Sequence, residues 1–138
     1  MSGEELTLLL GEAERGVTRR LAQVFADHDC TVGRWRTLAV LDRDGSRRMS
    51  ELAKVAQLAP ASLTRLIDGM VADNLVYRKV DPRDRRSVLV HVAPRGSKLY
   101  RQLSERIHLE NGSIFGDVDP DELADLVNSL AAFVARLR

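Results

Sequence analysis

The chain has 138 residues and a formal net charge of +1, and this small sum hides a segregation of charge along the sequence. Residues 1–30 hold three Lys/Arg against six Asp/Glu, residues 31–101 hold fifteen against seven, and residues 102–138 hold three against seven. A basic middle between acidic ends favours an anionic partner for the middle alone. No run of about 18 apolar residues occurs, so no membrane-spanning helix is predicted.

The cysteine content and the first residues favour a cytoplasmic protein. Cys30 is the only cysteine, so no internal disulfide can form, as is usual in a reducing compartment. The first five residues, MSGEE, lack the cationic start of a secretory signal.

Three helices are predicted in the first 56 residues. Apolar residues recur at helical spacing from Glu4 to His28, which indicates a long amphipathic helix. Thr31 suits the N-cap of a second helix that runs to about Leu41, and residues 42–46 (DRDGS) form the loop that ends it. Residues 50–56 form a short third helix.

The segment 60–74 is predicted to be a helix with two unlike faces. Its apolar residues share one face at helical spacing: Leu63, Leu66, Ile67 and Met70. The remaining surface is small and polar around one long cation: Ala61, Ser62, Thr64, Arg65 and Asp68. Pro60 suits the first helical turn, and Asn74 tolerates the left-handed conformation that ends many helices. The polar face can therefore approach another surface closely.

A charged hairpin is predicted after this helix. Residues 76–80 and 87–92 are rich in β-branched residues and partly alternate, and the segment 81–86 (DPRDRR) opens with a turn-forming Asp-Pro. From residue 78 to residue 86 there are five cations against two anions, a local net charge of +3.

Two more helices are predicted after the hairpin. Pro94 begins one, which Asn111-Gly112 and Gly116 interrupt or end. The other has Asp119 as N-cap and Pro120 at its first position. Apolar residues cover so much of the last helix that we expect it to be buried on two sides, the second by another subunit.

The order helix, short turn, helix, hairpin is typical of a winged helix-turn-helix. The fold class expected is mainly α with a small β-hairpin wing. We expect an N-terminal dimerisation helix at 1–30, a DNA-binding domain at 31–93 and C-terminal dimerisation helices at 94–138.

Within this order, short motifs occur at regular positions: SELA (50–53), LTR (63–65), LVYR (75–78), DPRDRR (81–86) and Gly96. Over most of the chain this series resembles the MarR family of winged-helix bacterial regulators. The resemblance implies a homodimer held by its terminal helices on a pseudo-palindromic operator. It places residues 60–74 in the major groove and the hairpin tip in the minor groove. It also implies repression of nearby genes, relieved by a small aromatic or anionic ligand.

The residues expected to contact DNA lie on the polar helix face and the hairpin: Pro60, Ala61, Ser62, Thr64, Arg65, Arg78, Arg83, Arg85 and Arg86. Guanidinium groups suit a narrow, negative minor groove. Arg65 is the candidate base-reading residue, with phosphate contact as the alternative. Asp81 and Asp84 are expected to brace neighbouring arginines, because phosphates repel a carboxylate.

Several alternatives stay open. The winged helix could dock a protein instead of DNA. Cys30 is an inert buried residue or, alternatively, an oxidant sensor, and Trp35 belongs to the core or to a ligand pocket. Catalysis is not expected, because the three histidines are scattered and no Gly-rich phosphate loop is present. With no cysteine pair either, no metal or other cofactor is expected.

Overall fold

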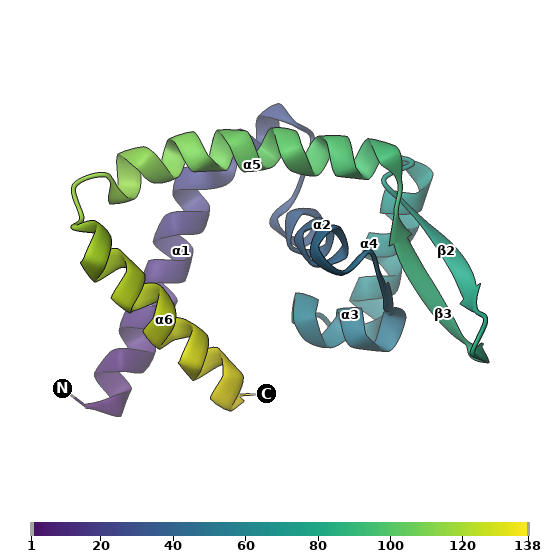
Figure 1. The fold of residues 1–138 in the computed structure, drawn as a ribbon, viewed down its shortest axis with the longest axis horizontal. Helices are drawn as coiled ribbons and strands as arrows, with labels where there is room; N and C mark the ends of the chain where they lie inside the picture. Colours follow the sequence, from purple (N-terminus) through teal and green to yellow (C-terminus); the bar gives the residue numbers. More distant parts are fainter. Residues whose placement is uncertain (1, 138) are drawn as a thin grey trace.

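The computed structural model describes residues 2–137, which form an arch with a small winged unit at one end (Figure 1). In chain order the elements are α1 (Gly3–Asp27), α2 (Val32–Asp44), β1 (Ser46–Arg48), α3 (Met49–Ala56), α4 (Pro60–Ala72), β2 (Val76–Asp81), β3 (Asp84–Val92), α5 (Pro94–Phe115) and α6 (Pro120–Leu137). The expected fold class, helices with a small β wing, is confirmed.

The winged unit comprises α2 through β3. Its three strands pair antiparallel in the order β1-β3-β2, so β3 lies in the middle of the sheet. The apolar faces of α2, α3 and α4 meet in one core against this sheet, and Leu38, Leu52, Ile67, Met70 and Val90 are all fully buried there. Burial of these side chains fixes the angle between α3 and α4.

The helix α5 runs along the top of the arch and joins the winged unit to the other end (Figure 1). Leu103 and Ile107 on its lower side pack with Leu21, Val24 and Phe25 of α1 in a second buried cluster. Gly112 does not interrupt α5, contrary to the sequence prediction. Asparagine-glycine is a weak helix breaker when the helix continues into ordinary residues on both sides.

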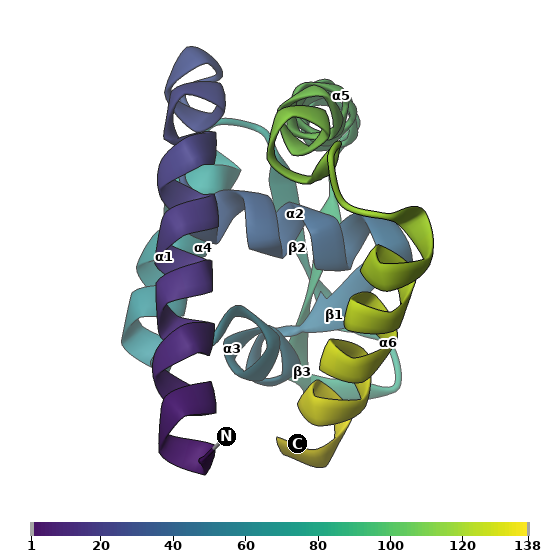
Figure 2. The same ribbon diagram turned by 90° about the vertical axis from the view of Figure 1, so that its left-hand side faces the viewer.

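The last helix differs most from expectation, because the chain itself buries neither of its sides. None of the residues of α6 is buried, and Leu126, Val127, Phe133 and Val134 are all at least 44 % exposed. Leu8 and Leu9 in the first half of α1 are exposed as well. Seen along the arch, α1 and α6 descend on opposite sides of the molecule (Figure 2). The expectation that the rest of its own chain buries one side of α6 is therefore wrong.

The predicted loop at 42–46 is also wrong in part. Thr31 caps α2 as expected, since its Oγ1 accepts a hydrogen bond from the N–H of Arg34 (3.2 Å). The helix, however, continues to Asp44, and Ser46–Arg48 is a strand. This strand is held by pairing with residues 89–91 of β3, a partner far away in the sequence. Only Gly45, with a φ of 81°, makes the turn between helix and strand.

The boundaries after α4 follow the prediction closely. Asn74 has a φ of 60° and so turns the chain from helix into strand, although the helix itself ends at Ala72. The strands of the wing are longer than expected and leave only Pro82 and Arg83 between them. Within residues 2–137, no helix combines the length and the apolar character needed to cross a membrane.

Candidate nucleic-acid interface

The exposed face of α4 is low and polar near its N-terminal end. Ala61, Thr64, Arg65 and Asp68 are exposed and Ser62 is half-buried. Leu63, Ile67 and Met70 on the other face are buried in the core. Because the buried face is anchored in this way, the short side chains allow the helix backbone to come close to a flat or grooved partner.

The N-terminus of α4 is open. Ala59 stands at the N-cap position and provides no side-chain hydrogen bond, and Pro60 follows in the first turn. The first N–H groups of a helix have no partner within the helix and carry partial positive charge, so this end attracts anions such as phosphate. The Thr64 hydroxyl donates a hydrogen bond to the Pro60 carbonyl (3.0 Å), which leaves its oxygen lone pairs free to accept.

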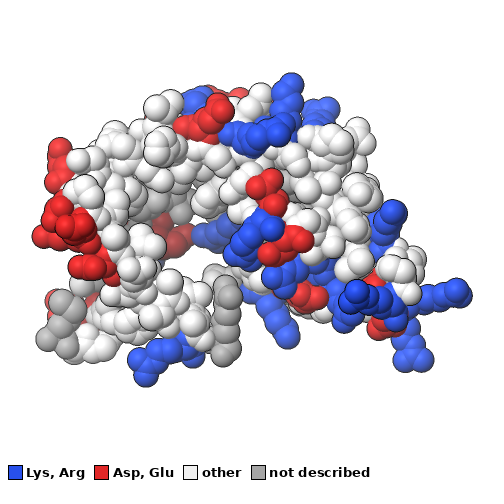
Figure 3. All heavy atoms as spheres, viewed as in Figure 1, with Lys and Arg blue, Asp and Glu red and all other residues white. Residues whose placement is uncertain are grey.

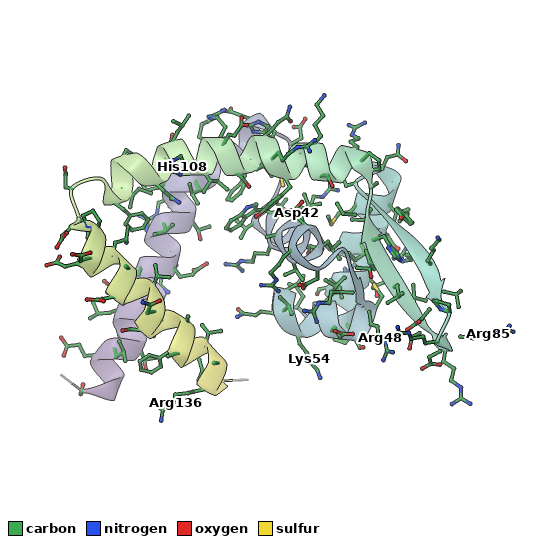
Figure 4. All side chains as sticks on the ribbon, in the orientation of Figure 1. Asp42, Arg48, Lys54, Arg85, His108 and Arg136 are labelled. Atoms are coloured by element: carbon green, nitrogen blue, oxygen red, sulfur yellow. The ribbon has the colours of Figure 1, made fainter. Side chains whose placement is uncertain are left out.

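The tip of the wing carries three arginines that point into solvent. Arg83, Arg85 and Arg86 are exposed, and within residues 2–137 their guanidinium groups form no ion pair. Arg85 extends away from the body of the molecule at the very end of the hairpin (Figure 4). Cations that are not neutralised by neighbouring carboxylates remain available to an anionic partner.

The two carboxylates of the wing hold its backbone. Asp81 is 4 % exposed, accepts a hydrogen bond from the N–H of Arg83 (2.9 Å) and pairs with the guanidinium of Arg48 (Oδ2 to Nη2, 3.3 Å). Asp84 accepts hydrogen bonds from the N–H of Arg86 (3.1 Å) and the hydroxyl of Ser87 (3.2 Å). Of the tip arginines, these carboxylates bind only the backbone N–H groups of Arg83 and Arg86, so the guanidinium groups of the tip stay free.

Arg78 differs from the arginines of the tip. It lies near the base of the wing, and its guanidinium forms an ion pair with Asp68 on α4. The pair joins the two elements that carry the candidate contacts. Arg78 therefore contributes less net positive charge to the surface than Arg83, Arg85 or Arg86.

Two basic residues that sequence reasoning did not select lie on the same edge of the molecule. Arg48 at the end of β1 and Lys54 on α3 project from the lower edge of the winged unit, on the same edge as the tip with Arg85 (Figure 4). In the space-filling view, basic side chains gather over this edge and the wing, and acidic side chains gather at the junction of α5 and α6 (Figure 3). One part of the basic middle of the chain thus lies along this edge, and other basic side chains lie over α5 (Figure 3).

Cys30 and Trp35 lie in the second buried cluster. Cys30 is 7 % exposed, and burial raises the pKa of its thiol, although the Arg34 charge acts in the opposite direction. A thiol with a raised pKa is a poor nucleophile at neutral pH. Trp35 packs its ring against Phe25, with ring centroids 5.6 Å apart, and is half-buried.

The model of the MarR family matches residues 30–88, which cover the helix-turn-helix and most of the wing. Over these residues the chain is similar to the MarR family. Its curated relatives include the HTH-type transcriptional regulator PetP of Rhodobacter capsulatus, 25 % identical over 122 residues, 88 % of this chain and 74 % of PetP. The family is one of transcriptional regulators, which are typically not enzymes.

Solved structures share this fold over most of the chain. BpsR of Bordetella bronchiseptica, whose DNA binding is described as regulated by 6-hydroxynicotinic acid, is 25 % identical, with a TM-score of 0.81 over 94 % of this chain and 98 % of BpsR. A mutant MarR from E. coli, solved with operator DNA, is 24 % identical, with a TM-score of 0.81 over 94 % of this chain and 93 % of MarR. At that identity, the likeness to E. coli MarR shows only the fold of this chain.

Proposed function

We propose that the protein is a homodimeric transcriptional regulator that binds double-stranded DNA with sequence specificity and represses nearby genes. The observation that carries the proposal is the shared edge of α4 and the wing. An uncapped helix N-terminus, a low polar helix face and unpaired wing cations lie there together. A protein that contacts both the phosphate backbone and the base edges in the grooves of a duplex requires this combination.

In this proposal, α4 enters the major groove and the wing tip follows the adjacent minor groove. Pro60, Ala61, Ser62 and Thr64 contact the backbone and base edges, and Arg65 donates two hydrogen bonds to a guanine. Arg83, Arg85 and Arg86 neutralise phosphates or enter the minor groove. Arg78 acts at the wing base, while Asp81 and Asp84 keep the tip in shape. Arg48 and Lys54 extend the phosphate-binding edge.

A second copy of the chain would cover the apolar surfaces of α1 and α6. These surfaces include Leu126, Val127, Phe133 and Val134, whose exposure is unusual for side chains of this size in an isolated protein. A dimer with two-fold symmetry would present two copies of α4 to a pseudo-palindromic operator. The division into residues 1–30, 31–93 and 94–138 follows from these roles.

Release of DNA by a small aromatic or anionic ligand is the proposed mode of control. It is supported by the relative BpsR, whose DNA binding is described as regulated by a small aromatic acid. A regulator that acts on chromosomal DNA works in the cytoplasm, in agreement with the single cysteine. The low reactivity expected of the buried Cys30 thiol favours ligand control over oxidant sensing.

The decisive experiment has two arms. Sedimentation velocity at micromolar concentration measures the oligomeric state, and selection of bound duplexes from a random pool, followed by anisotropy titration, measures DNA binding. We expect a dimer that enriches a two-fold symmetric sequence and loses affinity steeply with salt. A winged helix that docks a protein would enrich no sequence and show a shallow salt dependence. A monomer without sequence preference would refute the proposal.

A further inference from the structure

A pocket of about 470 Å³ lies between the middle of α1 and the end of α5. Its apolar lining comes from Ala13, Gly16 and Val17 of α1 and from Ile114 of α5. A Cβ added at Gly16 would meet no atom within 4 Å, so the space above this residue is open. Val17 and Ile114 are only half-buried. The pocket can therefore receive an apolar side chain from another molecule.

Two cations at this pocket are available to an anionic partner. Arg19 and Arg20 line the pocket, are exposed and form no ion pair with any other residue from 2 to 137. The pocket is at the end of the arch that is remote from the wing (Figure 1). These two arginines are therefore separate from the cations of the DNA-binding edge.

The end of α5 and the start of α6 carry the opposite charge. From residue 107 to residue 135 the chain has no Lys or Arg and six acidic residues: Glu110, Asp117, Asp119, Asp121, Glu122 and Asp125. None of the six forms an ion pair within residues 2–137. Glu122 lies one turn before Leu126 and so borders the apolar face of α6. This acidic junction is complementary in charge to the pocket on α1.

The position of the DNA-binding edge determines how a second copy meets this end of the arch. A two-fold axis shared by a dimer and its operator is perpendicular to the duplex. The candidate contacts lie along the lower edge, so this axis runs vertically in Figure 2. There α1 and α6 descend on opposite sides, with both chain ends at the bottom. Rotation about a vertical axis exchanges the sides and keeps the height, so α1 faces the partner's α6 and the two helices run in opposite directions.

The same rotation brings the partner's acidic junction to the pocket. Ile114 near the end of α5 lines the pocket, so the partner's α5 also ends at this height and its α6 begins there. Nearer the lower ends, the apolar side chains of α1 meet those of the partner's α6. These side chains include Leu9, Leu10, Phe133 and Val134, all at least 41 % exposed. Charge and apolar surface are thus complementary in one arrangement.

We infer that the pocket on α1 receives the start of α6 of a second copy of the chain, and that Arg19 and Arg20 pair there with the partner's Asp117 and the partner's Glu122. Complementary charges set the register of an interface and suppress wrong partners more than they add affinity. The arginines therefore select a partner that is acidic at this junction and repel one that is basic. The inference rests on the dimer of the proposed function and adds which surfaces meet and how the partner is chosen.

Opposite charge reversals test the pairing. Arg19→Glu with Arg20→Glu makes the pocket acidic, and Asp117→Lys with Glu122→Lys makes the junction basic. Either double variant alone brings like charges together at both contacts of the dimer, so sedimentation velocity should give a dimer dissociation constant at least about tenfold above that of the wild type. In an equimolar mixture, opposite charges meet at both contacts of a heterodimer. Native mass spectrometry should therefore find mainly the heterodimer.

Arg15→Glu is the matched control. It makes the same change of charge on the same helix, but Arg15 is not among the residues that line the pocket and lies about 140° around the helix from Arg20. This variant should dimerise like the wild type, and circular dichroism checks that each variant is folded. In about 0.5 M salt the differences between the variants should shrink. Wild-type dimerisation of both charge variants, or no more heterodimer than random pairing gives, overturns the inference.

The same measurements separate this inference from the proposed function. A wild-type protein that is monomeric refutes both. A wild-type dimer whose charge variants dimerise equally well leaves the proposed function standing and refutes the pairing. A dimer with the expected dependence on charge that selects no DNA sequence retains the pairing and refutes the proposed DNA binding.

Discussion

Replacing Arg85 by alanine should flatten the salt dependence of DNA binding. Of the exposed cations that form no ion pair among residues 2–137, five on α3, α4 and the wing are proposed DNA contacts of each subunit: Lys54, Arg65, Arg83, Arg85 and Arg86. A dimer carries two copies of each. If all of them neutralise phosphates, the slope of log K against log salt is about −9, since each phosphate contributes about −0.9.

Arg85→Ala removes one contact per subunit, so the slope should become shallower by about 1.8. Between about 50 and 200 mM salt, the wild type then loses about twelvefold more affinity than the variant. Anisotropy titrations on the selected duplex at four or five salt concentrations measure both slopes. Arg101→Ala also removes one positive charge, but from α5, outside the proposed interface. Its slope of log K against log salt should equal that of the wild type. If Arg85→Ala gave the same slope as the wild type, the wing tip would not contact phosphate.

Four further outcomes are expected. Arg65→Ala should weaken binding to the selected duplex by about 1–3 kcal/mol and binding to random duplex far less; equal losses would mean phosphate contact only. Phe133→Asp places a charge on the exposed apolar face of α6 and should give monomers in sedimentation velocity. Gly96→Ala should lower the free energy of unfolding, measured in urea, by about 1–3 kcal/mol or more, because the new Cβ would lie 2.1 Å from the Leu75 carbonyl oxygen. The control Gly112→Ala, whose new Cβ would lie in open space, should stabilise α5. Burial raises the pKa of the Cys30 thiol, so its alkylation in the native protein should be slow at neutral pH and faster as the pH rises above the usual thiol range. Equal alkylation rates for native and urea-unfolded protein would contradict this.

Local patterns predicted the parts of the fold that depend on neighbouring residues. The buried face of α4 follows from apolar spacing alone, and the left-handed Asn74 follows from its tolerance of that conformation. The cap of α2 by Thr31 likewise depends on a residue three positions away. Each of these features is decided within one or two helical turns, so a single stretch of sequence contains the information.

Features that depend on distant partners were missed. The strand Ser46–Arg48 has only three residues, and β3 supplies its hydrogen bonds from more than forty positions away. The pairing of Arg78 with Asp68 and of Arg34 with Asp73 likewise needs the packed fold. Local spacing does not reveal which charges are neutralised, and that determines which arginines remain available to a ligand.

The candidate interface was predicted in part for the same reason. The wing arginines stand out because they follow one another in the sequence, but Arg48 and Lys54 join them only after β1 and α3 have been placed beside the hairpin. The apolar pattern of α6 was recognised, yet it could not show that the chain leaves the whole helix uncovered. In sequence, a helix that a partner molecule buries has the same apolar pattern as a helix that its own chain buries.

Because α5 is a single unbroken helix, a small rotation at one of its ends produces a large displacement at the other. Its 22 residues span about 33 Å, from the base of the wing to the far end of the arch. A tilt of about 10° at the far end displaces the wing base by about 6 Å, nearly twice the 3.4 Å rise of one base pair. Substitutions near Gly116, far from any nucleotide, are therefore expected to change the preferred spacing between operator half-sites.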